Sequence, residues 1–134
     1  MAKTILKLTI KPSVHFLANV KTVYQLLESD SGDYIGKYSG LNEDYEKVSS
    51  KSVISKSHVD QMLASLTNIT IQAFPVSEMI FCDGNFVELE INTGRVSANY
   101  EWHVEPPNEW KQLSDIADQL QHLVENNLSS EFKI

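Results

Sequence analysis

Hydrophobic and polar positions alternate with a period of two along residues 3–11, KTILKLTIK. One face of such a segment would hold Thr4, Leu6, Leu8 and Ile10, and the other would hold Lys7, Thr9 and Lys11. Successive side chains of a strand point to opposite faces, and proline cannot continue a central strand. The alternation, ended by Pro12, therefore predicts a first β-strand.

Residues 16–28 fit two different structures. Phe16, Val20, Val23, Tyr24 and Leu27 fall on one face of a helix, whereas Val20, Thr22, Tyr24 and Leu26 fall on one face of a strand. Because valine and tyrosine favour strands, we favour a strand over residues 20–28, and the helix stays open as an alternative. Ser-Asp-Ser-Gly-Asp at 29–33 predicts a turn, and a weaker alternation at 34–38 predicts a third strand.

The middle of the chain predicts a loop and then a helix. Residues 39–55 are polar and include a tract of serine and lysine, which is typical of a loop. Ser57 can cap the N-terminus of the helix, and Asp60 lies in its first turn. Asn68 marks its end, and residues 70–74 are expected to be extended. The apolar stripe of this helix would consist of Val59, Met62, Leu63 and Leu66.

The second half of the chain has the clearest strand pattern. Segments 78–82, 86–91 and 95–104 are separated by Asp-Gly at 83–84 and Asn-Thr-Gly at 92–94, and both turn sequences favour hairpins. In the last segment the residues expected to face inward are Val96, Ala98, Tyr100, Trp102 and Val104. The three segments therefore predict a meander of consecutive antiparallel strands.

Pro-Pro-Asn at 106–108 interrupts the sheet and opens a second amphipathic helix. Its apolar stripe consists of Trp110, Leu113, Ile116, Ala117, Leu120, Leu123 and Val124. We expect this helix to cover the inward face of the last strand, with Trp102 and Leu120 both buried. The whole pattern predicts one α+β domain over residues 1–134, an antiparallel sheet of five to six strands with a C-terminal meander, packed against two helices.

Charge narrows the classes of function. The 134 residues include eleven basic and eighteen acidic side chains, a formal net charge of −7. Residues 1–75 carry eight basic and seven acidic side chains, whereas residues 76–134 carry three basic and eleven acidic ones. Binding to phosphate backbones requires lysine and arginine, so we expect no nucleic-acid partner and favour a basic protein partner. The alternative is that the acidity serves solubility alone.

The sequence also sets expectations about location. No apolar run is long enough for a transmembrane helix, and the first residues lack the pattern of a signal peptide. The lone cysteine, Cys82, cannot form an internal disulfide. We therefore expect a cytoplasmic protein with no membrane partner.

Patterns for catalysis and metal binding are weak. The four histidines, His15, His58, His103 and His122, include no pair with the spacing of metal ligands, and Cys82 has no second cysteine beside it. No nucleophile elbow, phosphate-binding loop or dinucleotide fingerprint occurs. We accordingly expect no metal, no cofactor and no enzymatic activity.

A set of carboxylates in the second half forms the candidate partner-binding site. On a sheet face, paired carboxylates are consistent with a glycosidase, with a solvated surface, or with a docking surface for lysine and arginine. We assign packing roles to Trp102 and Trp110, although both residue types are also common at binding hot spots. The candidate partner-binding residues are Glu88, Glu90, Glu101, Glu105 and Glu109.

The segment 101–110, EWHVEPPNEW, joins the last strand to the last helix, after a first strand, a leucine-rich helix and an alternating strand. This order resembles small bacterial immunity proteins of polymorphic toxin systems. It is similar also to small bacterial inhibitors of metalloproteases, although the polar stretch at 39–55 has no counterpart. The resemblance implies a cytoplasmic protein that neutralises a toxin, a basic nuclease, by covering its active site. Protease inhibition is the alternative, and an enzyme using exposed carboxylates is a third hypothesis.

Overall fold

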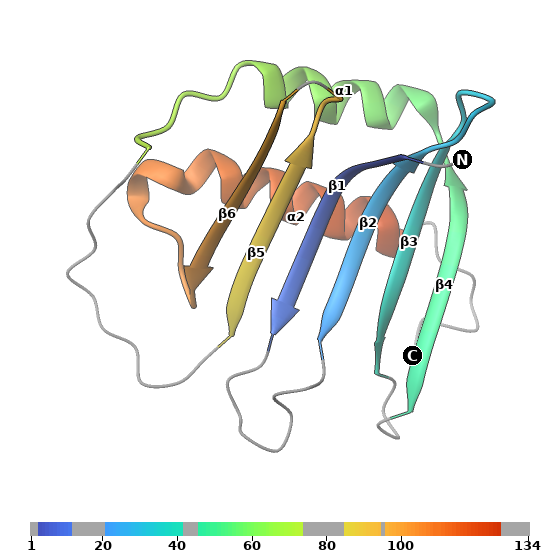
Figure 1. The fold of residues 1–134 in the computed structure, drawn as a ribbon, viewed down its shortest axis with the longest axis horizontal. Coiled ribbons are helices and arrows are strands. Elements are labelled where there is room, and N and C mark those ends of the chain that lie inside the picture. Colours follow the sequence, from blue (N-terminus) through green and yellow to red (C-terminus); the bar gives the residue numbers. More distant parts are fainter. Residues whose placement is uncertain (1–2, 12–20, 42–45, 74–84, 95, 127–134) are drawn as a thin grey trace.

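The computed structural model describes residues 3–11, 21–41, 46–73, 85–94 and 96–126 (Figure 1). The strands are β1 (Lys3–Lys11), β2 (Thr22–Glu28), β3 (Tyr34–Leu41), β4 (Lys47–Ile54), β5 (Phe86–Asn92) and β6 (Ser97–His103). The helices are α1 (Lys56–Thr67), the short 3-10 helix η2 (Asn108–Trp110) and α2 (Lys111–Asn126). The six strands form one antiparallel sheet in the order β4-β3-β2-β1-β5-β6. The predicted α+β class, with an antiparallel sheet and two α-helices, is confirmed.

The two α-helices lie on the same side of the sheet (Figure 1). Helix α2 crosses behind the strands, and α1 runs along the margin where β4 ends. We call the helix-covered face the inner face, and the opposite face, which carries Lys7, Thr9 and Lys11, the outer face. The inner face therefore forms the core, and the outer face is the face of the sheet that points away from the two α-helices.

Strand β1 contains an irregularity that changes its predicted faces. Thr4 lies opposite Leu27 and Leu6 lies opposite Leu26, so Ile5 is an extra residue on β1. An extra residue of this kind is a β-bulge, and it shifts the alternation of faces. Thr4 consequently lies with Leu27 on the outer face, and its predicted place beside Leu6 is wrong.

The segment that was ambiguous between helix and strand is a strand where it is described. Tyr24 of β2 lies opposite Leu8 of β1 and Tyr38 of β3. Its first residues, up to 20, lie outside the described part of the chain. The turn at 29–33 is confirmed, with Gly32 at a φ of 88° and its N–H donated to the Ser29 carbonyl at 2.9 Å.

The loop predicted over residues 39–55 is wrong for most of its length. β3 continues to Leu41, and β4 pairs with it along residues 47–54 as the edge strand of the sheet. Ser50 and Ser52 occupy inward positions of β4, where a strand pattern would normally show apolar residues. An edge strand has fewer neighbours to pack against, so it can carry serine and lysine. Residues 42–45 lie outside the described part.

Helix α1 follows β4 directly. Its N-cap is Ser55 rather than the predicted Ser57, and the two hydroxyl oxygens lie 2.9 Å apart. Its end at Asn68 is confirmed. Residues 69–73 are not a strand of the sheet; Thr70 instead donates its N–H to the side chain of Gln112 at 3.0 Å.

Strand β5 lies between β1 and β6. Both edges of β5 are therefore paired with described strands. Residues 78–82 and the Asp-Gly turn lie outside the described residues. The second predicted turn is confirmed, because Thr93 donates its N–H to the Val96 carbonyl at 2.9 Å between β5 and β6.

The core lies between the inner face and the two α-helices. Helix α2 packs mainly on β2, β3 and β1, so it does not chiefly cover β6 as predicted. Trp102 and Leu120 are nevertheless both buried, with 8% and 0% of their surfaces exposed. The side chains that fill the core completely are Leu6, Leu8, Leu26, Val59, Leu89, Leu113, Ile116, Leu120 and Val124.

Candidate functional site

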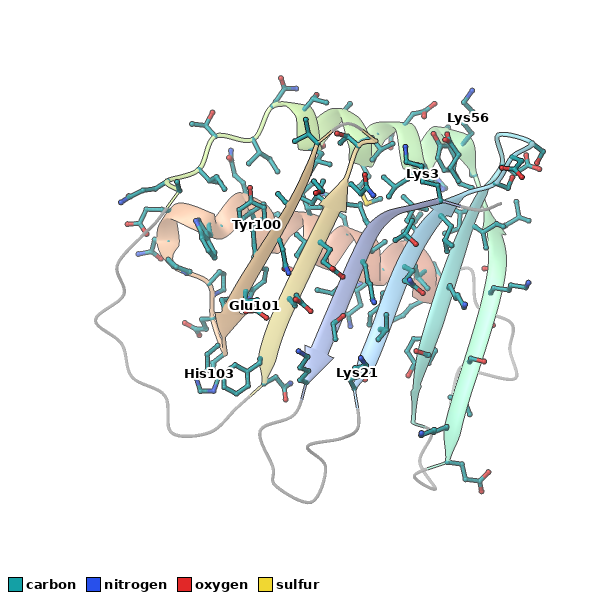
Figure 2. The ribbon with its side chains drawn as sticks, in the orientation of Figure 1. Lys3, Lys21, Lys56, Tyr100, Glu101 and His103 are labelled. Atoms are coloured by element: carbon teal, nitrogen blue, oxygen red, sulfur yellow. The ribbon has the colours of Figure 1, made fainter. Side chains whose placement is uncertain are left out.

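Three of the five candidate carboxylates lie together on the outer face. Glu88 of β5 lies directly opposite Glu101 of β6, and Glu90 is the next outer-face residue along β5. Two like charges at directly opposite positions disfavour each other, which raises the gain from a cation placed between them. We call Glu88, Glu90 and Glu101 the acidic surface. Figure 2, which looks onto the outer face, shows Glu101 toward the lower end of β6.

Two neighbours interact with the acidic surface. Asn99 donates a hydrogen bond from Nδ2 to Oε2 of Glu88 at 2.9 Å. Nζ of Lys7 lies 4.0 Å from Oε2 of Glu90, and 35% and 44% of these two side chains are exposed. An ion pair so open to water contributes between about zero and 1 kcal/mol. Glu90 therefore keeps most of its capacity to attract a partner cation.

The rest of the outer face carries the opposite charge. The register places Lys51, Lys37, Gln25 and Lys7 side by side across β4, β3, β2 and β1, in the same row as Glu90. The outer face is thus basic over β1, β3 and β4 and acidic over β5 and β6. This division of charge was not predicted, because the lysines of β4 fell in a predicted loop.

The other two candidates, Glu105 and Glu109, lie off this face. After β6 the backbone turns at Val104, which has a φ of 66° and donates its N–H to the Asn85 carbonyl at 2.8 Å. The chain then passes from the edge of the sheet to the helix layer (Figure 1). Both glutamates are exposed on this connection. They can contact a partner only if it extends around the β6 edge.

A hollow lies at the end of the acidic surface. Its volume is about 340 Å³, and it is lined by Lys11, Phe86, Val87, Glu88, Glu101, Trp102 and His103. The rings of Phe86 and His103 are stacked, with their centres 4.2 Å apart and their planes 9° apart. Phe86 is 50% exposed. This hollow therefore combines a flat aromatic surface with two carboxylates.

A second hollow, of about 520 Å³, adjoins the bulge of β1. Its lining includes the polar side chains of Lys7, Gln25, Glu90 and Asn99. It has no aromatic residue in its lining and joins the basic row to the acidic surface.

The two tryptophans belong to the core side of the sheet. Trp110 packs edge-on against Tyr100 and Trp102, with ring centres 5.4 Å and 6.5 Å apart. Its Nε1 donates a hydrogen bond to the carbonyl of Gln72 at 2.7 Å. The interpretation of both tryptophans as packing residues is confirmed. Among the described residues, the aromatic rings on the outer face are instead those of Phe86 and His103. The place of Phe86 beside Glu88 on an alternating strand was the signal in the sequence.

Beneath the sheet, a polar contact ties α2 to β2. The hydroxyl of Tyr24 donates a hydrogen bond to Oε1 of Glu125 at 2.8 Å, and Nε2 of Gln121 lies 3.3 Å from the same oxygen. Burial, followed by the hydrogen bond and the negative charge of Glu125, raises the pKa of Tyr24 well above its ordinary value. The pKa of Tyr38, whose ring lies 5.2 Å from that of Tyr24, is raised by burial and by Glu125.

The histidines are spread over the molecule. His58 and His122 are exposed on α1 and α2, His103 stacks on Phe86, and His15 lies outside the described residues together with Cys82. In the part of the chain that the structure describes, no three metal-ligating side chains are grouped around a common point.

Of the helices described, none has the length and apolar character needed to cross a membrane. No protein-family model matches the chain, and a comparison with curated proteins finds no match.

Proposed function

We propose that this chain is an immunity protein that binds a cognate toxin through its acidic surface. The observation that supports this most is the gathering of Glu88, Glu90 and Glu101 on two adjacent strands of the outer face. The exposed ring of Phe86 on the same face adds apolar contact area. Charged groups with an aromatic anchor are typical of surfaces that recognise another protein.

The partner that this surface fits best is a basic nuclease in the cytoplasm. A nuclease active site must attract phosphates, so it presents lysine and arginine. Carboxylates on a rigid sheet would occupy these cations and keep nucleic acid out. Complementary charge would also accelerate encounter between the two proteins.

The division of the outer face would align the partner. Lysine side chains of a toxin are attracted by β5 and β6 and repelled by Lys37 and Lys51 on β3 and β4. Repulsion at the wrong position is as useful for specificity as attraction at the right one. The toxin should therefore sit over the β5–β6 side and extend past the β6 edge, where it can reach Glu105 and Glu109.

The test begins with the neighbouring gene: where it encodes a toxin domain, that domain is co-expressed with the chain. The chain should restore growth of cells that express this domain, and the two purified proteins should form a complex. The rate of association should fall steeply with salt, since the Debye length shrinks from about 10 Å at 0.1 M to about 3 Å at 1 M.

Charge reversal locates the interface. Glu88→Lys with Glu90→Lys should abolish protection, and Glu105→Lys with Glu109→Lys should weaken it. The matched control is Asp115→Lys with Asp118→Lys, which makes the same change of charge on exposed positions of α2. If the first pair protects as well as the control, the acidic surface is not the interface. If the neighbouring gene encodes a protease that the chain inhibits, the toxin hypothesis is replaced by protease inhibition.

A further inference from the structure

We infer that the hollow between Phe86, His103, Glu88 and Glu101 binds a single arginine side chain presented by the partner protein. This inference rests on the proposed function, because it names the partner group that the acidic surface receives. The hollow is the part of the outer face where a planar ring surface and two carboxylates meet.

The charge of the hollow fits one positive group. Glu88 and Glu101 contribute two negative charges, and Lys11 contributes one positive charge to the same lining. These three charged side chains sum to a net charge of −1. A single positive charge neutralises it, whereas a divalent metal ion would leave one positive charge in excess.

The shape of the lining favours a guanidinium over an ammonium group. A guanidinium is planar, stacks on aromatic faces and donates paired hydrogen bonds to carboxylates. Phe86 offers a half-exposed ring, held nearly parallel to the ring of His103. Glu88 and Glu101 stand opposite each other on adjacent strands, so a group on the ring can reach both. A lysine ammonium can use the charges but not the flat surface.

The size of the hollow is appropriate for a side chain. Its volume of about 340 Å³ is near the lower end of ligand pockets, which span roughly 300–1,000 Å³. Such a volume accommodates one long side chain at an interface rather than a large cofactor. Once the partner is bound, the surrounding contacts would exclude water from an arginine held there, as is typical of interface hot spots.

The experiment measures binding of N-acetyl-arginine amide to the isolated full chain by NMR. The side-chain signals of Phe86 and His103 and the indole signal of Trp102 should shift on titration. The uncharged analogue N-acetyl-citrulline amide should bind at least about tenfold more weakly, and N-acetyl-lysine amide should fall between them. If arginine and citrulline amides give equal shifts, charge recognition in the hollow is absent and the inference is wrong.

Variants separate the two parts of the lining. Glu88→Gln with Glu101→Gln should remove the preference for arginine over citrulline. Phe86→Leu should remove the preference for arginine over lysine while charge recognition remains. The control is Asp115→Asn with Asp118→Asn on α2, which loses the same charge away from the hollow and should leave the titration unchanged. Circular dichroism and the proton spectrum establish that each variant is folded.

The inference and the proposed function can fail separately. If arginine amide shifts the hollow but no neighbouring toxin is neutralised, the hollow binds arginine and the immunity function is wrong. If the toxin is neutralised and Phe86→Leu and Glu101→Gln leave its affinity unchanged, the interface avoids the hollow and the inference is wrong. One result would support both the inference and the proposed function. Substitution of a single arginine of the toxin should weaken the complex as much as the pair Glu88→Gln with Glu101→Gln does. Combining the arginine substitution with this pair should cause no further loss of affinity.

Discussion

Tyr24 and Glu125 are 101 residues apart in the chain and are joined by a hydrogen bond of 2.8 Å between the phenol and the carboxylate. This contact connects the centre of the sheet to the last turn of α2. The hydrogen bond is partly buried, and the ring of Tyr38 lies 5.2 Å from that of Tyr24, so water cannot easily replace either partner.

Tyr24→Phe should lower the free energy of unfolding by about 1–3 kcal/mol, because it removes the donor and leaves a partly buried carboxylate without it. Urea denaturation of the wild type and the variant measures this difference. Tyr100→Phe is the control, since this ring packs by its edge on Trp110. A loss for Tyr24→Phe no larger than for the control would show that the hydrogen bond contributes nothing to stability.

Stability should fall at alkaline pH. Burial raises the folded-state pKa of Tyr24, and that of Tyr38, above the ordinary value of 10.0. Above pH 10 the folded protein therefore still holds these protons when the unfolded chain has released them. The contribution of the two tyrosines to the free energy of unfolding is fully present below pH 10 and is lost as the pH rises above it. The slope should approach about 1.4 kcal/mol per pH unit for each proton retained. Denaturation curves measured across this range, compared with Tyr24→Phe, should show a shallower decline for the variant.

Leu120→Ala should destabilise the protein by about 2–5 kcal/mol, because the side chain is completely buried and its removal leaves a cavity. Thermal or urea unfolding provides the measurement. Asp118→Ala, two residues earlier and exposed, should change stability by no more than about 0.5 kcal/mol. Equal effects of the two substitutions would mean that α2 is not packed on the sheet.

Gly36 permits the close approach of β3, β4 and α2. A Cβ atom at this position would clash with the side chain of Ile54 and lie 3.4 Å from Val124. Gly36→Ala should therefore cost about 1–3 kcal/mol. Ile54→Val removes the closest methyl group, so the same glycine substitution should cost less in that background. Additive effects in this double-mutant cycle would contradict the steric explanation.

The pattern of residues along the chain predicted correctly those helices and strands that have one apolar face and one polar face. Phe86, Glu88 and Glu90 alternate with apolar residues, and the structure places them together on the outer face as the sequence indicated. β4 was missed because Ser50 and Ser52 stand at inward positions, where periodicity analysis looks for apolar side chains. The bulge at Ile5 was also not predicted, because the alternation of apolar and polar residues does not reveal an extra residue.

The candidate site was predicted in part. The acidic strands were recognised, but Glu105 and Glu109 were grouped with them because they are close in sequence. The hollow depends on the register of β5 with β6, which stacks Phe86 on His103. Register within a hairpin is fixed by the geometry of its turn, which the alternation of residues does not give, so the pattern alone did not reveal this pair.

The pairing of β1 with β5 has a consequence for how the chain folds. Strands β1 to β4 are consecutive in sequence and neighbours in the sheet, so they can assemble early through local contacts. β5 must then close a long loop to reach β1, and contacts so distant in sequence form slowly. The local β5–β6 hairpin places Glu88 opposite Glu101, and both residues join the rest of the sheet only in this late step. In a chain still emerging from the ribosome we therefore expect the basic strands to form before the acidic ones, so that the proposed binding of a toxin would begin only when the C-terminal hairpin has docked.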